Sequence, residues 1–112
     1  MNSKRKGSGG ERELLKILQE NGFPDAVRND QMYVGGFHNP DISASFSGLP
    51  IHVEVKRVEK LNLIEAIGQA VADADQKAFP VVVHRKNRGP WLVSFRLIDL
   101  LGVLNDKTRA DE

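Results

Sequence analysis

Cysteine is absent from this chain of 112 residues, and its absence excludes several kinds of chemistry. Without thiols the protein has no disulfide, no thiolate zinc site and no cysteine nucleophile. No apolar run approaches the ~20 residues of a membrane-spanning helix, and no charged segment followed by an apolar one forms a leader at the start. We therefore expect a soluble, cytoplasmic protein without a membrane partner. At this length we expect one domain with a single core.

Two catalytic schemes also lack their sequence signals. Residues 7–10 (Gly-Ser-Gly-Gly) precede a helical pattern, but the preceding strand and the Gly-Lys-Ser/Thr ending of a nucleotide-binding loop are missing. A serine–histidine–acid triad needs a histidine near a serine on a sharp elbow, and the sequence contains no such elbow. The sequence thus predicts no nucleotide cofactor and no serine hydrolase.

The net charge of +1 is small, but basic side chains are concentrated in two segments. One segment opens the chain, and the other surrounds residue 85. Two basic patches in a nearly neutral chain favour a polyanionic partner such as DNA, although a flexible tail and a solvated loop would give the same pattern. The residues predicted to contact DNA are Lys4, Arg5, Lys6, Arg12, Lys16, His84, Arg85 and Arg88.

Residues 1–10 are polar, basic and glycine-rich, which predicts a flexible arm, and residues 105–112 form a polar tail. Between them, residues 11–104 should form one α/β domain. Hydrophobic periodicity, capping residues and turn residues predict its elements. In chain order these are a helix at 11–21, strands at 26–28, 41–46 and 51–56 with a turn at 47–50, a helix at 62–78, strands at 81–85 and 91–95, and a short helix at 96–101.

Residues 40–56 carry the charges that point to chemistry. Alternation along two strands places Glu54 and Lys56 on one face of the second strand, and the short turn would bring Asp41 beside them. Two converging carboxylates repel each other unless a divalent cation lies between them, and their hard oxygen atoms suit magnesium or manganese. An ammonium group on the same face could hold or polarise a water molecule. This pattern predicts metal-assisted hydrolysis of a phosphodiester.

The same residues, Pro40-Asp41, twelve residues and then Glu54-Val55-Lys56, resemble the signature of the PD-(D/E)xK nuclease superfamily. Residues 4–8 (Lys-Arg-Lys-Gly-Ser) and 11–14 (Glu-Arg-Glu-Leu) are similar to the start of the archaeal-type Holliday-junction resolvases in that superfamily. The resemblance covers residues 4 to about 60 well, and beyond them only the order of elements matches. It implies a restriction-endonuclease-like core of order α-β-β-β-α-β, with a mixed central sheet flanked by helices.

The resemblance also implies roles for individual residues. Glu11, Asp41 and Glu54 would hold Mg²⁺, for which Mn²⁺ could substitute, and the backbone carbonyl of Val55 would complete the coordination. Lys56 would orient or activate the attacking water.

Two of the implied roles have competing explanations in the sequence itself. Glu11 could instead close a capping box with Ser8 at the start of its helix. Several nuclease branches of the superfamily place a helical glutamine beside the catalytic lysine, and Gln69 is the candidate in this chain. Its alternative is an ordinary solvated helix face.

Three functions remain open at this point. The first is a structure-selective, junction-resolving endodeoxyribonuclease, the second a nuclease of the same fold acting on flaps, nicks or linear duplex, and the third a non-catalytic DNA-binding module. Resolvases usually have a serine directly after the Val-Arg of the first strand, where this chain has Asn29. A small footprint and the dimeric resolvase relatives predict a homodimer. The compact size suits a phage or prophage enzyme.

Overall fold

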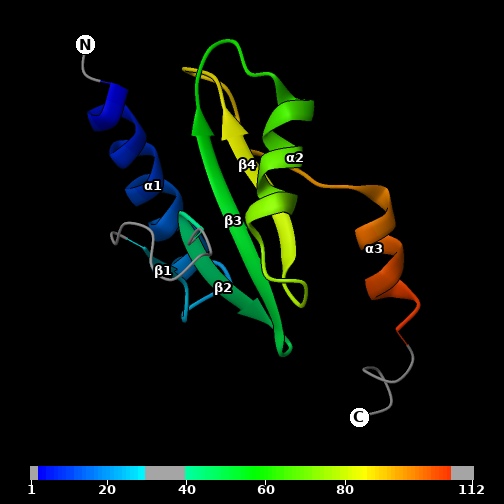
Figure 1. The fold of residues 1–112 in the computed structure, drawn as a ribbon. Helices are drawn as coiled ribbons and strands as arrows, with labels where there is room; N and C mark the ends of the chain where they lie inside the picture. The colour runs from blue at the N-terminus through cyan, green and yellow to red at the C-terminus, as the bar shows by residue number, and fades with distance from the viewer. Residues whose placement is uncertain (1–2, 30–39, 107–112) are drawn as a thin grey trace.

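The computed structural model describes residues 3–29 and 40–106, with side chains from Gly9 onward. The described chain forms three helices and five strands (Figure 1). They are α1 (Ser3–Glu20), β1 (Val27–Arg28), β2 (Ile42–Phe46), β3 (Leu49–Arg57), α2 (Leu63–Asp73), β4 (Phe79–Arg85), β5 (Leu92–Ser94) and α3 (Leu97–Leu104). The predicted order of helix, three strands, helix, two strands and helix is confirmed.

The five strands form one sheet in the order β1-β2-β3-β4-β5. Neighbours run antiparallel except β3 and β4, which are parallel and are connected by α2. A parallel pair needs such a crossover because the chain must return to the same end of the sheet before the next strand begins. The sheet is therefore mixed, as the sequence predicted.

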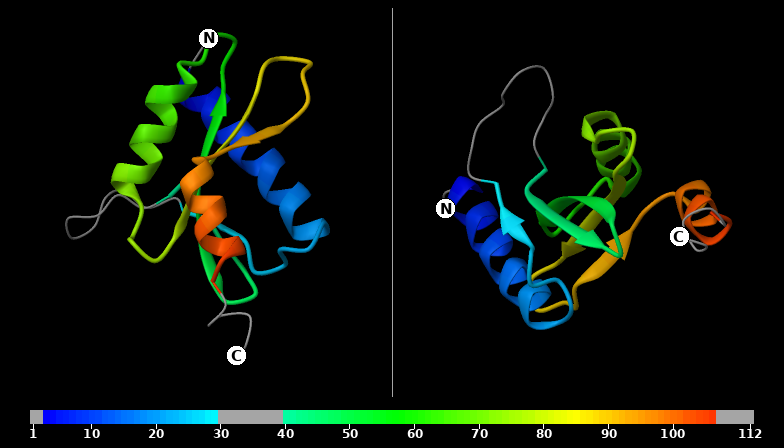
Figure 2. Two further views of the ribbon diagram at one scale, coloured as in Figure 1. Left: turned by 90° about the vertical axis from the view of Figure 1, so that its right-hand side faces the viewer. Right: turned by 90° about the horizontal axis from the view of Figure 1, so that it is seen from below.

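Helices α1 and α2 cover opposite faces of the sheet (Figure 2). On the α1 face, Leu14 packs with Ile42 and Val53 in a buried cluster. On the other face, Ala66 and Ala70 of α2 pack against Val82 of β4. Side chains alternate between faces along a strand, so Glu54, which pairs with Val82 across β3 and β4, lies on the α2 face.

A two-residue turn closes the β2–β3 hairpin. Ser47 and Gly48 have φ angles of 50° and 82°. Positive φ at both central positions matches the twist of hairpin strands. Leu49 and Pro50 already belong to β3, so the predicted turn at 47–50 was two residues too long. The register pairs Phe46 with Leu49 and continues to Ile42 opposite Val53.

Boundaries of all three helices differ from the predicted ones. Helix α1 begins at Ser3 instead of residue 11, which puts the glycine-rich segment inside the helix. Helix α2 ends at Asp73 because Asp75 forms a local turn, in which its side chain accepts from the Lys77 amide at 2.8 Å. Helix α3 begins one residue later and extends to Leu104. The start of α2 was predicted correctly, since Asn62 caps it.

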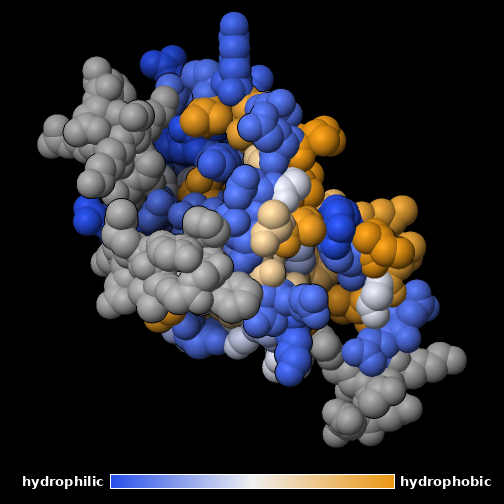
Figure 3. Space-filling model, viewed as in Figure 1, coloured by the Kyte–Doolittle hydropathy of each residue, from blue (hydrophilic) through white to orange (hydrophobic). Residues whose placement is uncertain are grey.

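The last strand and helix expose a large apolar surface. Helix α3 has no buried residue, and its Leu97 and Leu104 side chains are 67% and 69% exposed. Leu92 and Val93 of β5 are also more than half exposed. Figure 3 shows apolar side chains gathered over α3. Among the described helices, none has the length and apolarity that a membrane crossing requires.

Candidate active site

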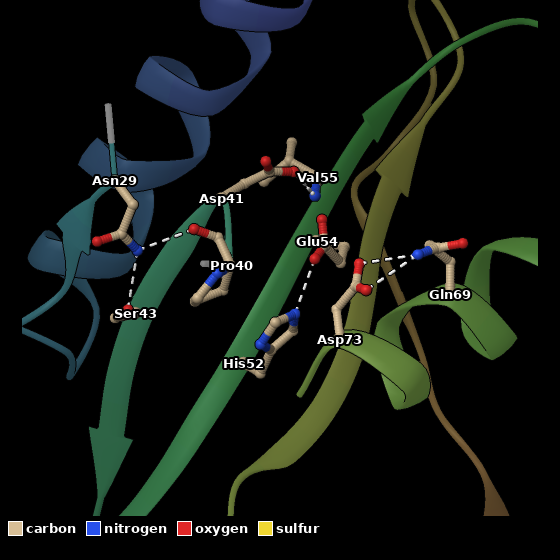
Figure 4. A network of polar contacts seen from close by, with 9 residues as sticks. All are labelled: Asn29, Pro40, Asp41, Ser43, His52, Glu54, Val55, Gln69 and Asp73. Carbon is tan, nitrogen blue, oxygen red and sulfur yellow. Dashed lines mark hydrogen bonds and ion pairs between the residues drawn. The ribbon is translucent and has the colours of Figure 1, made fainter. Parts of the chain in front are cut away.

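The predicted acidic pair meets where the β2–β3 ladder ends. Asp41 directly precedes β2, and the hairpin register places it opposite Glu54. The Val55 amide donates to Asp41 Oδ2 at 2.8 Å. This bond fixes the Asp41 carboxyl in the gap between the two strands, next to the side chain of Glu54 (Figure 4).

The surroundings of Asp41 disfavour the ionised form of its carboxyl group. Its pKa is raised from 3.8 to about 7. Burial is the main cause, and the nearby Glu54 and Glu11 carboxylates add to it, while the bond from Val55 opposes it. Desolvation and like charges both disfavour the ionised form. A site with these properties gains most from a bound positive charge.

Glu11 approaches the pair from α1, as the resemblance implied. Its Oε1 accepts from Arg28 Nε at 2.8 Å. Because Ser8 lies inside α1 and not at its start, the capping box between Ser8 and Glu11 is wrong. Glu11 is instead paired with Arg28 of β1, and its negative charge contributes to the raised pKa of Asp41.

These residues fit a divalent cation by the chemistry of their donors. Asp41 and Glu54 offer carboxylate oxygens at one place, and magnesium and manganese prefer such ligands. Within the described residues, no three acidic or histidine side chains yet surround a common point. Glu11 is bonded to Arg28, which explains why it does not complete the set.

Lys56 and Gln69 lie on the same side of the sheet as Glu54. Both line one surface hollow between β3 and α2. The Gln69 amide donates to both oxygens of Asp73 at 3.0 Å, one helical turn further along α2. The predicted proximity of the glutamine to the lysine is therefore present, while the Gln69 amide is engaged within its own helix.

Asn29 fastens the segment that carries Asp41. Its side chain donates to the Pro40 carbonyl and to Ser43 Oγ, both at 2.9 Å. Its backbone amide donates to the Asp41 carbonyl at 3.0 Å. The residue that stands in place of the resolvase serine thus holds the backbone on both sides of the Asp41 side chain.

One neighbour of the acidic pair was not predicted. His52 Nε2 lies 2.7 Å from Glu54 Oε1 (Figure 4). The sequence signal was available, because residues 52 and 54 share a strand face. The pattern alone does not indicate burial, because the polar face of an alternating strand is usually in contact with solvent.

The residues predicted to contact DNA fall into separate groups. Arg12 and Lys16 are exposed on α1, and Arg88 is exposed in the turn after β4. His84 bonds Ser94 Oγ at 2.9 Å, and burial lowers its pKa, which favours the neutral ring. The side chains of Lys4, Arg5 and Lys6 lie outside the described residues.

Arg85, which was predicted to contact DNA, ends β4 as expected but already has a protein partner. It points to the α1 face, where it forms an ion pair with Glu13 and lies over the Trp91 ring. Glu13 also accepts from Trp91 Nε1 at 3.1 Å and lies 3.7 Å from an Arg57 nitrogen. This Glu13 cluster, which sequence reasoning missed, joins α1 to β3, β4 and the start of β5.

The mixed sheet lies between helices and carries Asp41, Glu54 and Lys56 near the point where the pairing of β2 with β3 ends. This arrangement defines a restriction-endonuclease-like nuclease fold. Over residues 2–111 the chain matches the family described as "Phage putative PDDEXK endonuclease". The chain belongs to this family of PD-(D/E)xK endonucleases.

Among solved structures, the chain is similar to Hjc from Archaeoglobus fulgidus, a Holliday junction resolvase from an archaeal hyperthermophile. The two share 29% identity with a TM-score of 0.63, over 79% of this chain and 75% of Hjc. No curated protein matches the chain. The predicted superfamily and the predicted resemblance to resolvases are both confirmed.

Proposed function

We propose that the protein is a metal-dependent endodeoxyribonuclease that is selective for branched DNA and acts on it in the cytoplasm. The observation that carries this proposal is the partly buried pair of Asp41 and Glu54 at the end of the β2–β3 ladder, with Lys56 on the same face as Glu54. Two carboxylates held this close together do not stabilise a fold, but metal-assisted phosphodiester hydrolysis uses a cation bound at such a place. The similarity to Hjc supports the preference for branched DNA.

Each residue has a role in this proposal. Asp41 and Glu54, completed by Glu11 and the Val55 carbonyl, would hold Mg²⁺ or Mn²⁺, which when bound stabilises negative charge developing at phosphorus. Lys56 orients the attacking water, and Gln69 supports it from α2. In-line attack then leaves a 5′-phosphate.

DNA contact is assigned mainly to exposed cations. Arg12 and Lys16 extend from α1, and Arg88 lies beyond β4. Lys4, Arg5, Lys6 and His84 remain part of the proposed surface. Arg85 we assign to packing, because the Glu13 carboxylate already neutralises it.

The choice of substrate is tested with labelled DNA. A four-way junction, a flap and a linear duplex of equal length are incubated with the protein and Mg²⁺, with chelator as the control. We expect paired, symmetric cuts in the junction and little cutting of the linear duplex. Equal cutting of all three would support a same-fold nuclease of broader specificity. Binding without cleavage at any metal concentration would leave only a DNA-binding module.

The same proposal includes a homodimer, whose interface we assign to the exposed apolar surface of β5 and α3. Leu92, Val93, Leu97 and Leu104 are all more than half exposed there. Arg96 and Asp99, at the start of α3, pair with each other at 2.8 Å and so contribute little net charge. Homodimer interfaces are enriched in such apolar, charge-poor surfaces. A two-fold dimer would present two active sites to a symmetric junction.

We expect the double substitution Leu97→Glu with Leu104→Glu to convert the dimer to a monomer. Burying two carboxylates in an apolar interface is far more costly than leaving them in water. Sedimentation velocity at micromolar concentration measures the change. Ile64→Glu is the matched control, because Ile64 is 79% exposed on α2, outside this surface. A monomeric parent protein, or a dimeric double variant, would contradict the assignment.

A further inference from the structure

We propose that His52 is a positioning residue of the active site, which holds the Glu54 carboxylate in the orientation that metal binding requires. The inference rests on the proposed function. It concerns a side chain that the nuclease signature does not include.

The placement of His52 is unusual for its chemistry. Its side chain is 4% exposed, and it is the only polar or charged side chain that is fully buried among residues 9–29 and 40–106. The ring lies on the α2 face of β3, next in the ladder to Ser43 and Pro80. A buried imidazole is costly unless it is hydrogen-bonded, and valine or isoleucine would suit a central strand better. Its presence at this position points to a use beyond packing.

The ring contacts one oxygen of Glu54, and the rest of the carboxyl group is directed toward Asp41. Nε2 lies 2.7 Å from Oε1. Figure 4 shows the second oxygen pointing away from His52, along the strand toward the side of Asp41 and Val55. Residues two apart on a strand share a face, so the contact needs no distortion of β3. A long glutamate side chain is thereby confined to one orientation before any ligand arrives.

Asp41 is fixed in a comparable way from another direction. Its Oδ2 accepts from the Val55 amide, and Asn29 holds the flanking backbone. The Glu54 side chain is oriented by His52, whose Nε2 lies 2.7 Å from Oε1, while it also interacts with Asp41. Groups that orient metal ligands in this way typically change metal affinity or activity by about 10- to 100-fold when they are removed.

Three substitutions test the role of His52 against a purely structural one. His52→Gln places a terminal amide about as far from the backbone as Nε2 is. The side chain in His52→Asn is shorter, so its amide does not reach Glu54. His52→Leu removes the polar contact and fills the space. Mn²⁺ binding to the free protein is measured by calorimetry, cleavage is followed as a function of Mg²⁺ concentration, and stability is measured in chelator.

We expect His52→Leu and His52→Asn to bind Mn²⁺ about 10- to 100-fold more weakly and to need correspondingly more Mg²⁺ for cleavage. His52→Gln should stay within a few-fold of the parent, and His52→Leu should be at least as stable as the parent in chelator. If His52→Leu does not fold, the comparison of His52→Gln with His52→Asn decides.

Parent-like Mn²⁺ affinity in folded His52→Leu or His52→Asn would overturn the inference, and so would a His52→Gln variant as weak as His52→Asn. If the parent protein cleaves DNA with Mg²⁺ in the same experiment, either of these results rejects the role of His52 and leaves the proposed function standing. A parent protein that neither binds Mn²⁺ nor cleaves overturns the proposed function together with the role of His52.

Discussion

Replacing Asp41 with asparagine is expected to lower the cleavage rate by a factor of ~1000 or more. The amide removes a negative ligand from the proposed metal site and keeps the size of the side chain. Loss of charge stabilisation in the transition state typically costs several kcal/mol, and each ~1.4 kcal/mol corresponds to a factor of ten in rate. Single-turnover cleavage of the labelled junction in Mg²⁺ measures this loss.

Asp25→Asn is the matched control for this experiment. Asp25 is an exposed aspartate whose carboxylate contacts only Ser45 in the described hydrogen bonds, away from the proposed site. Its substitution should leave cleavage unchanged. Full activity of Asp41→Asn, or of the parent protein in chelator, would refute the mechanism.

The same substitution should make the metal-free protein more stable at neutral pH. The pKa of Asp41 is raised from 3.8 to about 7, chiefly by burial, so the folded protein holds this proton more tightly than the unfolded chain does. The stabilising contribution of the protonated group is complete below pH 4 and is lost as the pH rises through 7. After a discount for partial solvent exposure, the loss by pH 8 is about 2 kcal/mol.

Urea unfolding in chelator at pH 5 and pH 8 measures this effect. The parent protein should lose stability between the two values by more than Asp41→Asn does, and the variant should be the more stable of the two at pH 8. Mg²⁺ at a hundred times its dissociation constant should then add about 2.7 kcal/mol to the parent only. A variant with the same pH dependence as the parent would show that Asp41 ionises normally.

Glu13→Ala is expected to destabilise the fold by about 2 kcal/mol. Glu13 accepts from Arg85 and Trp91 and lies close to Arg57, so its removal leaves two neighbouring cations without their shared partner. Breaking a fully buried pair costs ~3–5 kcal/mol, and the figure is reduced because the Glu13 side chain is 35% exposed.

Urea unfolding at pH 7 measures the effect of Glu13→Ala. Glu13→Gln should lose less stability, since its amide oxygen can still accept from Trp91. Glu20→Ala, on the exposed end of the same helix, is the control and should change stability by less than ~0.5 kcal/mol. Equal stability of Glu13→Ala and Glu20→Ala would mean that the Glu13 cluster does not hold α1 to the sheet.

The central part of the site was predictable because it depends on local rules. Alternation and a short turn were enough to bring Asp41 opposite Glu54, and a capping residue, Asn62, was enough to indicate the start of α2. The direction of Arg85 was not predictable in the same way. It depends on which face of β4 receives α1 and on a carboxylate 72 residues earlier in the chain.

His52 and Glu11 illustrate a second limit. Their partners, Glu54 and Arg28, were both visible in the sequence. The sequence could not show that His52 is buried, because its burial depends on how the α2 face of the sheet is packed in the folded protein. For Glu11 the missing fact was that the helix starts earlier, which removes its capping partner.

The hairpin turn has a consequence for how relatives of this chain can differ in length. The twelve residues between Asp41 and Glu54 are five of β2, the two turn residues and five of β3. Lengthening the hairpin by one residue in each strand keeps the two carboxylates opposite each other, so the interval can grow or shrink in steps of two. A single added residue would send Glu54 and Lys56 to the α1 face unless a bulge absorbed it. Even intervals should therefore prevail among active relatives that keep this turn.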